Sequence, residues 1–156
     1  CKVFAPLMEK SGKGTIVNIT SLATLFPLPY MPLYNAGKSG LSSFTQSLML
    51  EYPEYPKLID FRLGDVRTSF NQSAPKQQES KQPESMKRAW KKIESQLVDS
   101  PVPRVAALQI VKALEKNKSG IFYGGGWFQS RLAPLICRIL PSSLLKFALK
   151  SRYGLS

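Results

Sequence analysis

The sequence predicts a parallel α/β fold. Three short apolar segments, at residues 15–20, 58–63 and 120–124, are rich in β-branched or aromatic side chains, and segments with helical periodicity lie between them. Strands that alternate with helices are typical of a parallel sheet covered by helices. The first segment is nearly continuous in its apolar character, which predicts a strand buried on both faces.

The elements of the first half follow from periodicity and from the residues that end helices. Residues 3–10 are expected to form a helix that ends in the glycine-containing segment 11–14. After a proline-rich loop at residues 21–32, apolar residues at helical spacing predict a helix over residues 34–51. The strand at residues 58–63 is expected to end at the glycine that follows it.

The second half begins with a polar excursion at residues 69–85, which is rich in Gln, Ser and Lys and is expected to lie outside the core. Four apolar residues at helical spacing then predict a short amphipathic helix: Met86, Trp90, Ile93 and Leu97. Ser100 as a cap and Pro101 in the first turn predict the start of another helix, which should run to about residue 116. The last strand is followed by two apolar helical segments, divided near Pro141.

The composition excludes several functional classes. A chain of 156 residues without histidine can hold neither a Ser-His-Asp triad nor a His-ligated zinc ion, and no metal site is expected. Two cysteines indicate a reducing, intracellular setting rather than a disulfide framework. No segment reaches the ~18 uninterrupted apolar residues of a membrane-spanning helix.

The formal net charge of +12 is compatible with a solvated basic surface or with an anionic partner. No Cys/His finger, aromatic RNA-binding signature or recognition-helix pattern is present, so nucleic acid is not expected as a partner. Between the two interpretations we favour the solvated surface.

Tyr34 and Lys38 form the most informative pair of residues. A spacing of four residues is about one helical turn, so both side chains are expected on one face of the helix at residues 34–51. A cation beside a phenol favours the phenolate form, which suits Tyr34 to act as an acid or base near neutral pH. Ser21 follows the first expected strand and precedes this helix.

These residues resemble motifs of the short-chain dehydrogenase/reductase (SDR) family. The matching segments are residues 16–21, 34–38 and 63–68, in the order and spacing of the family's C-terminal half. The resemblance implies a Rossmann-like, doubly wound parallel sheet whose N-terminal half, about 120 residues at ~30 per βα unit, is missing. The glycine-rich phosphate loop of that half is not found in these 156 residues.

The resemblance also implies roles for three catalytic residues. Ser21 would orient the substrate oxygen, Tyr34 would be the acid/base, and Lys38 would tune Tyr34 and hold the nicotinamide ribose. A serine that caps a turn, a packed tyrosine and a solvated lysine are the corresponding structural alternatives.

The resemblance implies an NAD or NADP cofactor, with NADP slightly favoured. It would be held by residues of the second and third motifs: Tyr34, Lys38, Gly64, Val66 and Thr68. Gly64 would allow close approach of the backbone to a ligand. Leu63 stands where the family usually has proline.

Two apolar segments suggest a lipophilic substrate such as a steroid, a retinoid or an acyl chain. One lies at residues 26–31 and the other in the helix that would act as a lid. The candidate substrate-binding residues are Ser21, Leu28, Tyr30 and Trp90. The alternative is that both segments simply pack on the core.

We therefore expect residues 1–126 to be the C-terminal part of a Rossmann-fold SDR domain, with residues 69–100 as a substrate lid, and residues 127–156 to be an amphipathic basic helical tail. The expected function is NAD(P)-dependent interconversion of an alcohol and a carbonyl. The alternative is a truncated, inactive chain that binds a lipid or membrane surface. The tail can lie on a membrane or, as we favour, cover the pocket or a subunit interface. A homo-oligomer is expected, in the cytoplasm, with membrane association left open.

Overall fold

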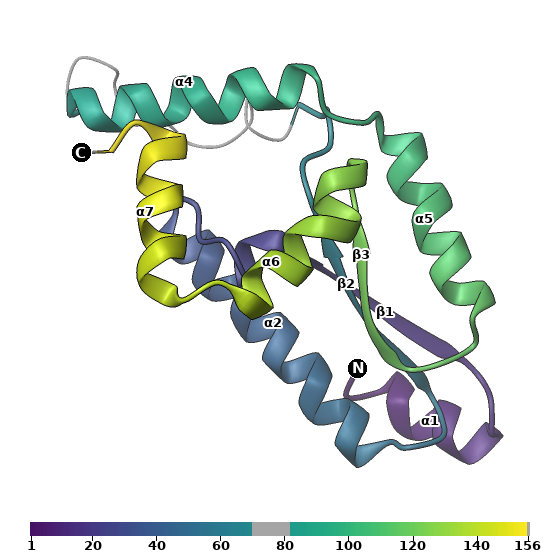
Figure 1. Ribbon diagram of the computed structural model, residues 1–156. Helices are drawn as coiled ribbons and strands as arrows, with labels where there is room; N and C mark the ends of the chain where they lie inside the picture. Colours follow the sequence, from purple (N-terminus) through teal and green to yellow (C-terminus); the bar gives the residue numbers. More distant parts are fainter. Residues whose placement is uncertain (70–81, 156) are drawn as a thin grey trace.

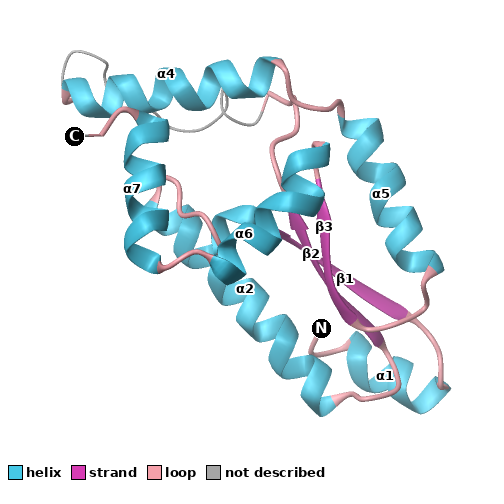
Figure 2. Ribbon diagram, in the orientation of Figure 1, coloured by secondary structure: helices cyan, strands magenta, loops and turns pink. Residues whose placement is uncertain are grey.

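The computed structural model describes residues 1–69 and 82–155. Its centre is a parallel sheet with the strand order β1-β2-β3, formed by β1 (Thr15–Ser21), β2 (Lys57–Leu63) and β3 (Gly120–Gly124). Helices surround the sheet, as Figures 1 and 2 show. The predicted parallel α/β fold is confirmed, and its arrangement is Rossmann-like.

Helices lie before, between and after the three strands along the chain. They are α1 (Phe4–Ser11), the 3₁₀ helix η1 (Leu22–Thr24), α2 (Pro32–Glu51), α4 (Glu84–Val98), α5 (Pro103–Glu115), the π-helix η3 (Phe128–Leu132), α6 (Ala133–Ile139) and α7 (Ser142–Tyr153). In Figure 1, α2 and α5 lie on opposite sides of the sheet, while α6 and α7 lie near its upper end together with α4.

The two faces of the sheet differ in chemistry, because successive side chains of a strand point to opposite faces. Asp60 and Arg62 of β2 lie on the face covered by α2, where they contact Ser42. Ile59 precedes Asp60, and Phe61 lies between Asp60 and Arg62. Both pack with Ala113 of α5 in an apolar cluster on the other face. We call these the polar face and the apolar face of the sheet.

The prediction that the first strand is buried on both faces is wrong for most of its length. In β1 only Thr20 and Ser21 are buried, and the five residues before them are half-buried. The most buried strand is β2, which has a strand on each side and whose residues 58–62 are all buried. Among the described residues β1 pairs with β2 alone, so its free side is less covered.

The predicted start of the helix near residue 100 is also wrong, since α5 begins at Pro103. The hydroxyl of Ser100 instead donates to the carbonyl of Gln96, 2.8 Å away, at the end of α4. The division of the tail near Pro141 is confirmed, because this residue precedes the first residue of α7. The excursion predicted at residues 69–85 lies mostly outside the described residues, which resume at residue 82.

Candidate active site

A cavity of about 640 Å³ lies at the carboxyl ends of β1 and β2, where α/β sheets usually bind their ligands. The end of β1, the start of α2 and the loop after β2 form one side, and helices α4 to α7 form the other. Most of the predicted site residues line this cavity: Ser21, Leu28, Tyr34, Lys38, Gly64, Val66 and Thr68. Three segments that are far apart in the sequence are therefore brought to one place.

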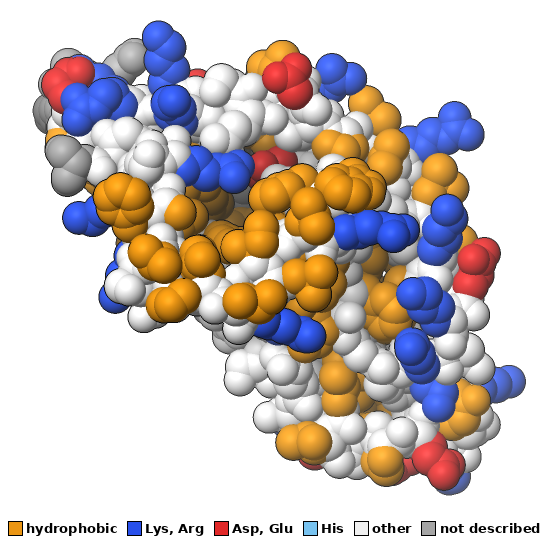
Figure 3. All heavy atoms as spheres, in the orientation of Figure 1, with side chains coloured by type: hydrophobic (Ala, Val, Ile, Leu, Met, Phe, Trp, Pro, Cys, Tyr) orange, Lys and Arg blue, Asp and Glu red, His pale blue; other side chains and the backbone are white. Residues whose placement is uncertain are grey.

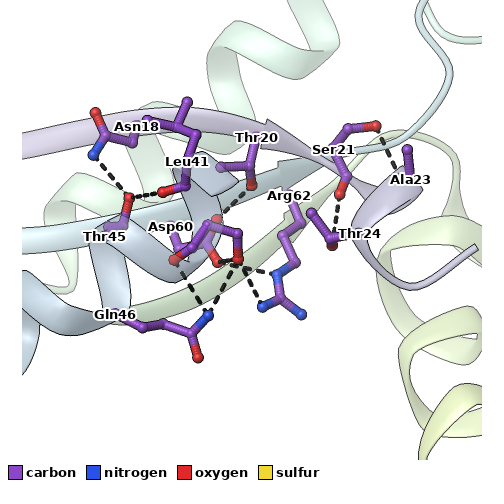
Figure 4. Close-up of polar contacts among 11 residues, drawn as sticks. Asn18, Thr20, Ser21, Ala23, Thr24, Leu41, Thr45, Gln46, Asp60 and Arg62 are labelled. Carbon is purple, nitrogen blue, oxygen red and sulfur yellow. Dashed lines mark hydrogen bonds and ion pairs between the residues drawn. The ribbon is translucent and has the colours of Figure 1, made fainter. Parts of the chain in front are cut away.

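Ser21 ends β1 and caps the short helix η1. Its hydroxyl oxygen accepts a hydrogen bond from the backbone N–H of Ala23 at 3.1 Å, and its carbonyl accepts one from the Thr24 hydroxyl at 2.8 Å. Figure 4 shows both bonds. Since the oxygen of Ser21 is the acceptor in the first bond, its hydroxyl hydrogen can still be donated to a substrate. The capping role and the catalytic role are therefore compatible.

Tyr34 and Lys38 lie on one face of the first turns of α2, as their spacing predicted. The ammonium nitrogen of Lys38 is 5.9 Å from the centre of the Tyr34 ring. It donates a hydrogen bond to the carbonyl of Ile19, 2.9 Å away. This bond ties the start of α2 to the end of β1 and keeps the ammonium group beside the phenol.

The loop after β2 is held by Gln129, a residue that the sequence analysis missed. The side-chain oxygen of Gln129 accepts from the backbone N–H of Asp65 at 3.0 Å, and its amide donates to the Asp65 carboxylate at 2.6 Å. A Cβ atom at residue 64 would lie 2.5 Å from this oxygen, so Gly64 is needed for the contact. In the structure a protein side chain of η3 lies close to Gly64, and the predicted approach of a ligand to this residue stays a prediction.

Helix α2 is fixed to the polar face of the sheet by a buried network. The carboxylate of Asp60 accepts from Ser42 at 2.6 Å, from Arg62 at 3.0 Å and from the hydroxyl of Thr20. Arg62 also donates to Ser42 at 3.0 Å. Figure 4 labels Thr20, Asp60 and Arg62 and also shows a second bond between strand and helix, from Asn18 to Thr45. We call these four residues, Thr20, Ser42, Asp60 and Arg62, the buried anchor.

The wall of the cavity away from the sheet is largely apolar. Ile93 and Leu97 of α4 and Ile136, Leu140, Leu145 and Leu149 of α6, α7 and their connection contribute to it. Tyr153 also lines the cavity and is only 4% exposed. Its burial raises the pKa of its phenol, so the group stays neutral and protonated near neutral pH.

Comparison with known proteins gives the family. The model of the short chain dehydrogenase family matches residues 1–79, which include Ser21, Tyr34, Lys38 and the loop after β2. This chain belongs to the short-chain dehydrogenase family. The match covers half of its length and agrees with the resemblance in the sequence motifs.

Three curated relatives extend over most of the chain. The 3-ketodihydrosphingosine reductase of Bacteroides thetaiotaomicron is 26% identical over 99% of this chain and 60% of its own length. The putative oxidoreductase SadH of Mycobacterium tuberculosis is 27% identical over 91% of this chain and 50% of the relative. The very-long-chain 3-oxoacyl-CoA reductase-A of Danio rerio is 27% identical over 86% of this chain and 37% of its own length. The chain thus spans about 60% or less of the length of these relatives.

Two predicted substrate residues of this short-chain dehydrogenase do not line the cavity. Tyr30 is 40% exposed, and its hydroxyl donates to Ser85 at 2.8 Å. Trp90 packs against the cluster of Ala89, Ile93 and Tyr153, behind the wall. Helical spacing placed Trp90 on the apolar face of α4, but the members of that face that line the cavity are Ile93 and Leu97.

Proposed function

We propose that this protein is an NAD(P)-dependent oxidoreductase that interconverts an alcohol and a carbonyl on a lipophilic substrate. The observation that carries the proposal is the position of Ser21, Tyr34 and Lys38 on one side of a cavity whose other side is apolar. Membership of the short-chain dehydrogenase family supports the reaction class.

In the direction of reduction, the phenol of Tyr34 gives its proton to the substrate oxygen while the carbonyl carbon accepts a hydride. When bound, the nicotinamide cofactor would supply that hydride. Ser21 donates a hydrogen bond to the same oxygen and holds the carbonyl in place. The ammonium group of Lys38, which lies beside the Tyr34 ring, would stabilise the phenolate that forms there, because opposite charges attract.

The residues around the cavity fit the nicotinamide and ribose end of the cofactor. Lys38 uses one N–H for the carbonyl of Ile19, and an ammonium group has three. Val66 and Thr68 line the same cavity on the loop after β2, where they could contact the carboxamide. Whether NAD or NADP is used stays a prediction, with NADP slightly favoured.

The lipophilic substrate is supported by the apolar wall and by the relatives. Two of the relatives are by name reductases of 3-ketodihydrosphingosine and of very-long-chain 3-oxoacyl-CoA. A cavity of about 640 Å³ is within the range of ~300–1,000 Å³ of small-molecule sites. We infer that an acyl chain lies against α4, α6 and α7 with its carbonyl at Tyr34.

The test is reduction of a long-chain 3-ketone, followed by the absorbance of NADH or NADPH, with the wild type and the Tyr34→Phe variant. Loss of the phenolic proton should lower kcat by roughly 10²–10⁴-fold. Tyr52→Phe, at the other end of α2, is the matched control and should be fully active. Undiminished turnover by Tyr34→Phe would overturn the assignment. A kcat/KM for a four-carbon ketone equal to that for the long-chain 3-ketone would contradict the proposal of a lipophilic substrate.

A further inference from the structure

Helices α6 and α7 carry apolar side chains on their outer surface. Ile139 is 81% exposed, Phe147 is 71% exposed, and Leu135 and Leu144 are each about half exposed. Figure 3 shows hydrophobic side chains gathered over the region of these two helices. Single exposed apolar residues are common, but a contiguous group of large ones marks a binding surface.

The charged side chains that η3, α6 and α7 themselves carry are all positive. Glu115 is the last acidic residue of the sequence, and seven of the 22 Lys and Arg residues follow it. Five of these cations belong to the helices after β3, and all are exposed: Arg131, Arg138, Lys146, Lys150 and Arg152. In Figure 3 blue side chains border the hydrophobic group. The surface is therefore complementary to one that is apolar inside and anionic at its boundary.

The same two helices also form the wall of the cavity. Ile136 and Leu140 line it from α6 and its end, and Leu145 and Leu149 line it from α7. Each helix thus has one apolar side toward the cavity and another toward the outside. A helix whose inner face alone was needed for the core would have no reason to keep the outer face apolar.

We propose that the outer face of α6 and α7, defined by Leu135, Ile139, Leu144 and Phe147, docks on the surface of an anionic lipid bilayer. Apolar side chains would enter the boundary between headgroups and acyl chains, and the surrounding cations would pair with anionic headgroups. Given the proposed function, this places the cavity next to the source of a lipid-like substrate.

The charge pattern favours a bilayer over a second copy of this chain. A symmetric dimer through the same face would bring the cations of one copy against those of the other, with no acidic residue of α6 or α7 to pair with them. Docking rather than spanning fits the structure, because no helix within the described ranges is long and apolar enough to cross a membrane.

The experiment is flotation of the full chain with vesicles of phosphatidylcholine, alone or with about one-third phosphatidylserine. We expect the protein to float with the anionic vesicles and to be released by high salt, which screens the charges. The double variant Ile139→Asp/Phe147→Asp should reduce the bound fraction by about tenfold or more, since it places charges in the apolar region. Arg138→Glu/Lys146→Glu should have a similar effect, because each cation contributes about fivefold in affinity.

Matched controls change residues of the same kind, apolar or cationic, at the start of α1 or on α1 and α5. Val3→Asp/Leu7→Asp alters two exposed apolar residues, and Lys10→Glu/Lys112→Glu alters two exposed cations. Both controls should float like the wild type. Far-UV circular dichroism should be unchanged in all four variants, since every substituted side chain is exposed. Tyr34→Phe should also float normally, which separates this proposal from the proposed reaction.

Three results would overturn the proposal that this face docks on a bilayer. The first is equal flotation of the wild type and the Ile139→Asp/Phe147→Asp variant, and the second is equal recovery with neutral and anionic vesicles. The third is a dimer in sedimentation velocity that Phe147→Asp converts to a monomer, which would assign this face to a second copy of the chain.

Discussion

The two faces of the sheet hold their helices in different ways. On the polar face, α2 is attached through directional bonds: Ser42 donates to Asp60 and accepts from Arg62, and Thr45 accepts from Asn18. On the apolar face, α5 is attached through contacts of Ile110 and Ala113 with the side chains of Ile59, Phe61 and Phe122. Hydrogen bonds fix a helix in one position along its axis, whereas apolar contacts are non-directional.

The helix that is held by hydrogen bonds is also the helix that carries the predicted catalytic residues. Helix α2 carries Tyr34 and Lys38, whose positions must be accurate to a fraction of an ångström for proton transfer. Helix α5 contributes to the cavity only through apolar or small side chains such as Ala106, Ala107 and Ile110. We infer that the role of the buried anchor is to position α2, since buried ion pairs often add little net stability.

The largest effect is expected for Asp60→Asn, which breaks the buried anchor. It removes the charge that compensates Arg62 and places an amide N–H near the donors of Ser42 and Arg62. The free energy of unfolding should fall by roughly 3–5 kcal/mol in urea denaturation, because a buried cation is left without its partner.

Two further variants sharpen this prediction. Asp99→Asn changes an exposed carboxylate at the end of α4 and should stay within about 0.5 kcal/mol of the wild type. Replacing both partners, as Asp60→Leu/Arg62→Met, should recover much of the lost stability. Recovery of stability without recovery of kcat would support a positioning role. If the double variant were as active as the wild type, the anchor would have no such role.

An intermediate effect is expected for Gly124→Ala on the apolar face. A Cβ atom at this position would lie 2.6 Å from Cε1 and 2.7 Å from Cζ of Phe61, a ring that is fully buried and cannot move away freely. Overpacking should lower the free energy of unfolding by roughly 1–3 kcal/mol. Gly40→Ala, with open space around it inside α2, should instead stabilise by about 0.5–1 kcal/mol. Equal thermal midpoints for the two variants would contradict the packing seen around Gly124.

The smallest effect is expected for Ile59→Val, which removes one methylene from the apolar cluster. The loss should be roughly 0.5–1.5 kcal/mol, several times less than for Asp60→Asn on the neighbouring residue of the same strand. Ile139→Val removes the same group from an exposed side chain and should change stability by less than about 0.5 kcal/mol. Urea denaturation of the three variants gives the loss of unfolding free energy for each. Equal losses for Asp60→Asn and Ile59→Val would mean that the two faces contribute equally.

Much of the fold could be predicted from local patterns. Apolar runs located the three strands to within one residue, and Gly12, with a positive φ of 60°, ends α1 as expected. The motifs around Ser21, Tyr34 and Lys38 also identified one side of the cavity. These features depend on residues that are close in sequence, or on a spacing that one helical turn dictates.

The parts that could not be predicted depend on contacts between distant residues. Gln129 meets Asp65 across 64 positions, and nothing local distinguishes it from the two polar residues that follow it, Ser130 and Arg131. Asp60 and Arg62 alternate along β2, which indicates a polar face, but their partner Ser42 lies on α2. Likewise, the start of α5 at Pro103 rather than near Pro101 is decided by the end of α4, since Ser100 is already used there.

The distance between the buried anchor and Tyr34 gives α2 the mechanics of a lever. Ser42 is the pivot, and Tyr34 lies eight residues nearer the start of the helix, about 12 Å away at ~1.5 Å per residue. The bond from Lys38 to the carbonyl of Ile19 opposes a tilt at that end. A tilt of about 5° at the pivot would move the phenol by about 1 Å, a displacement that can change a rate by roughly 10²-fold. Substitutions in the sheet residues that contact α2 could in this way change the turnover rate while every residue that touches the substrate stays the same.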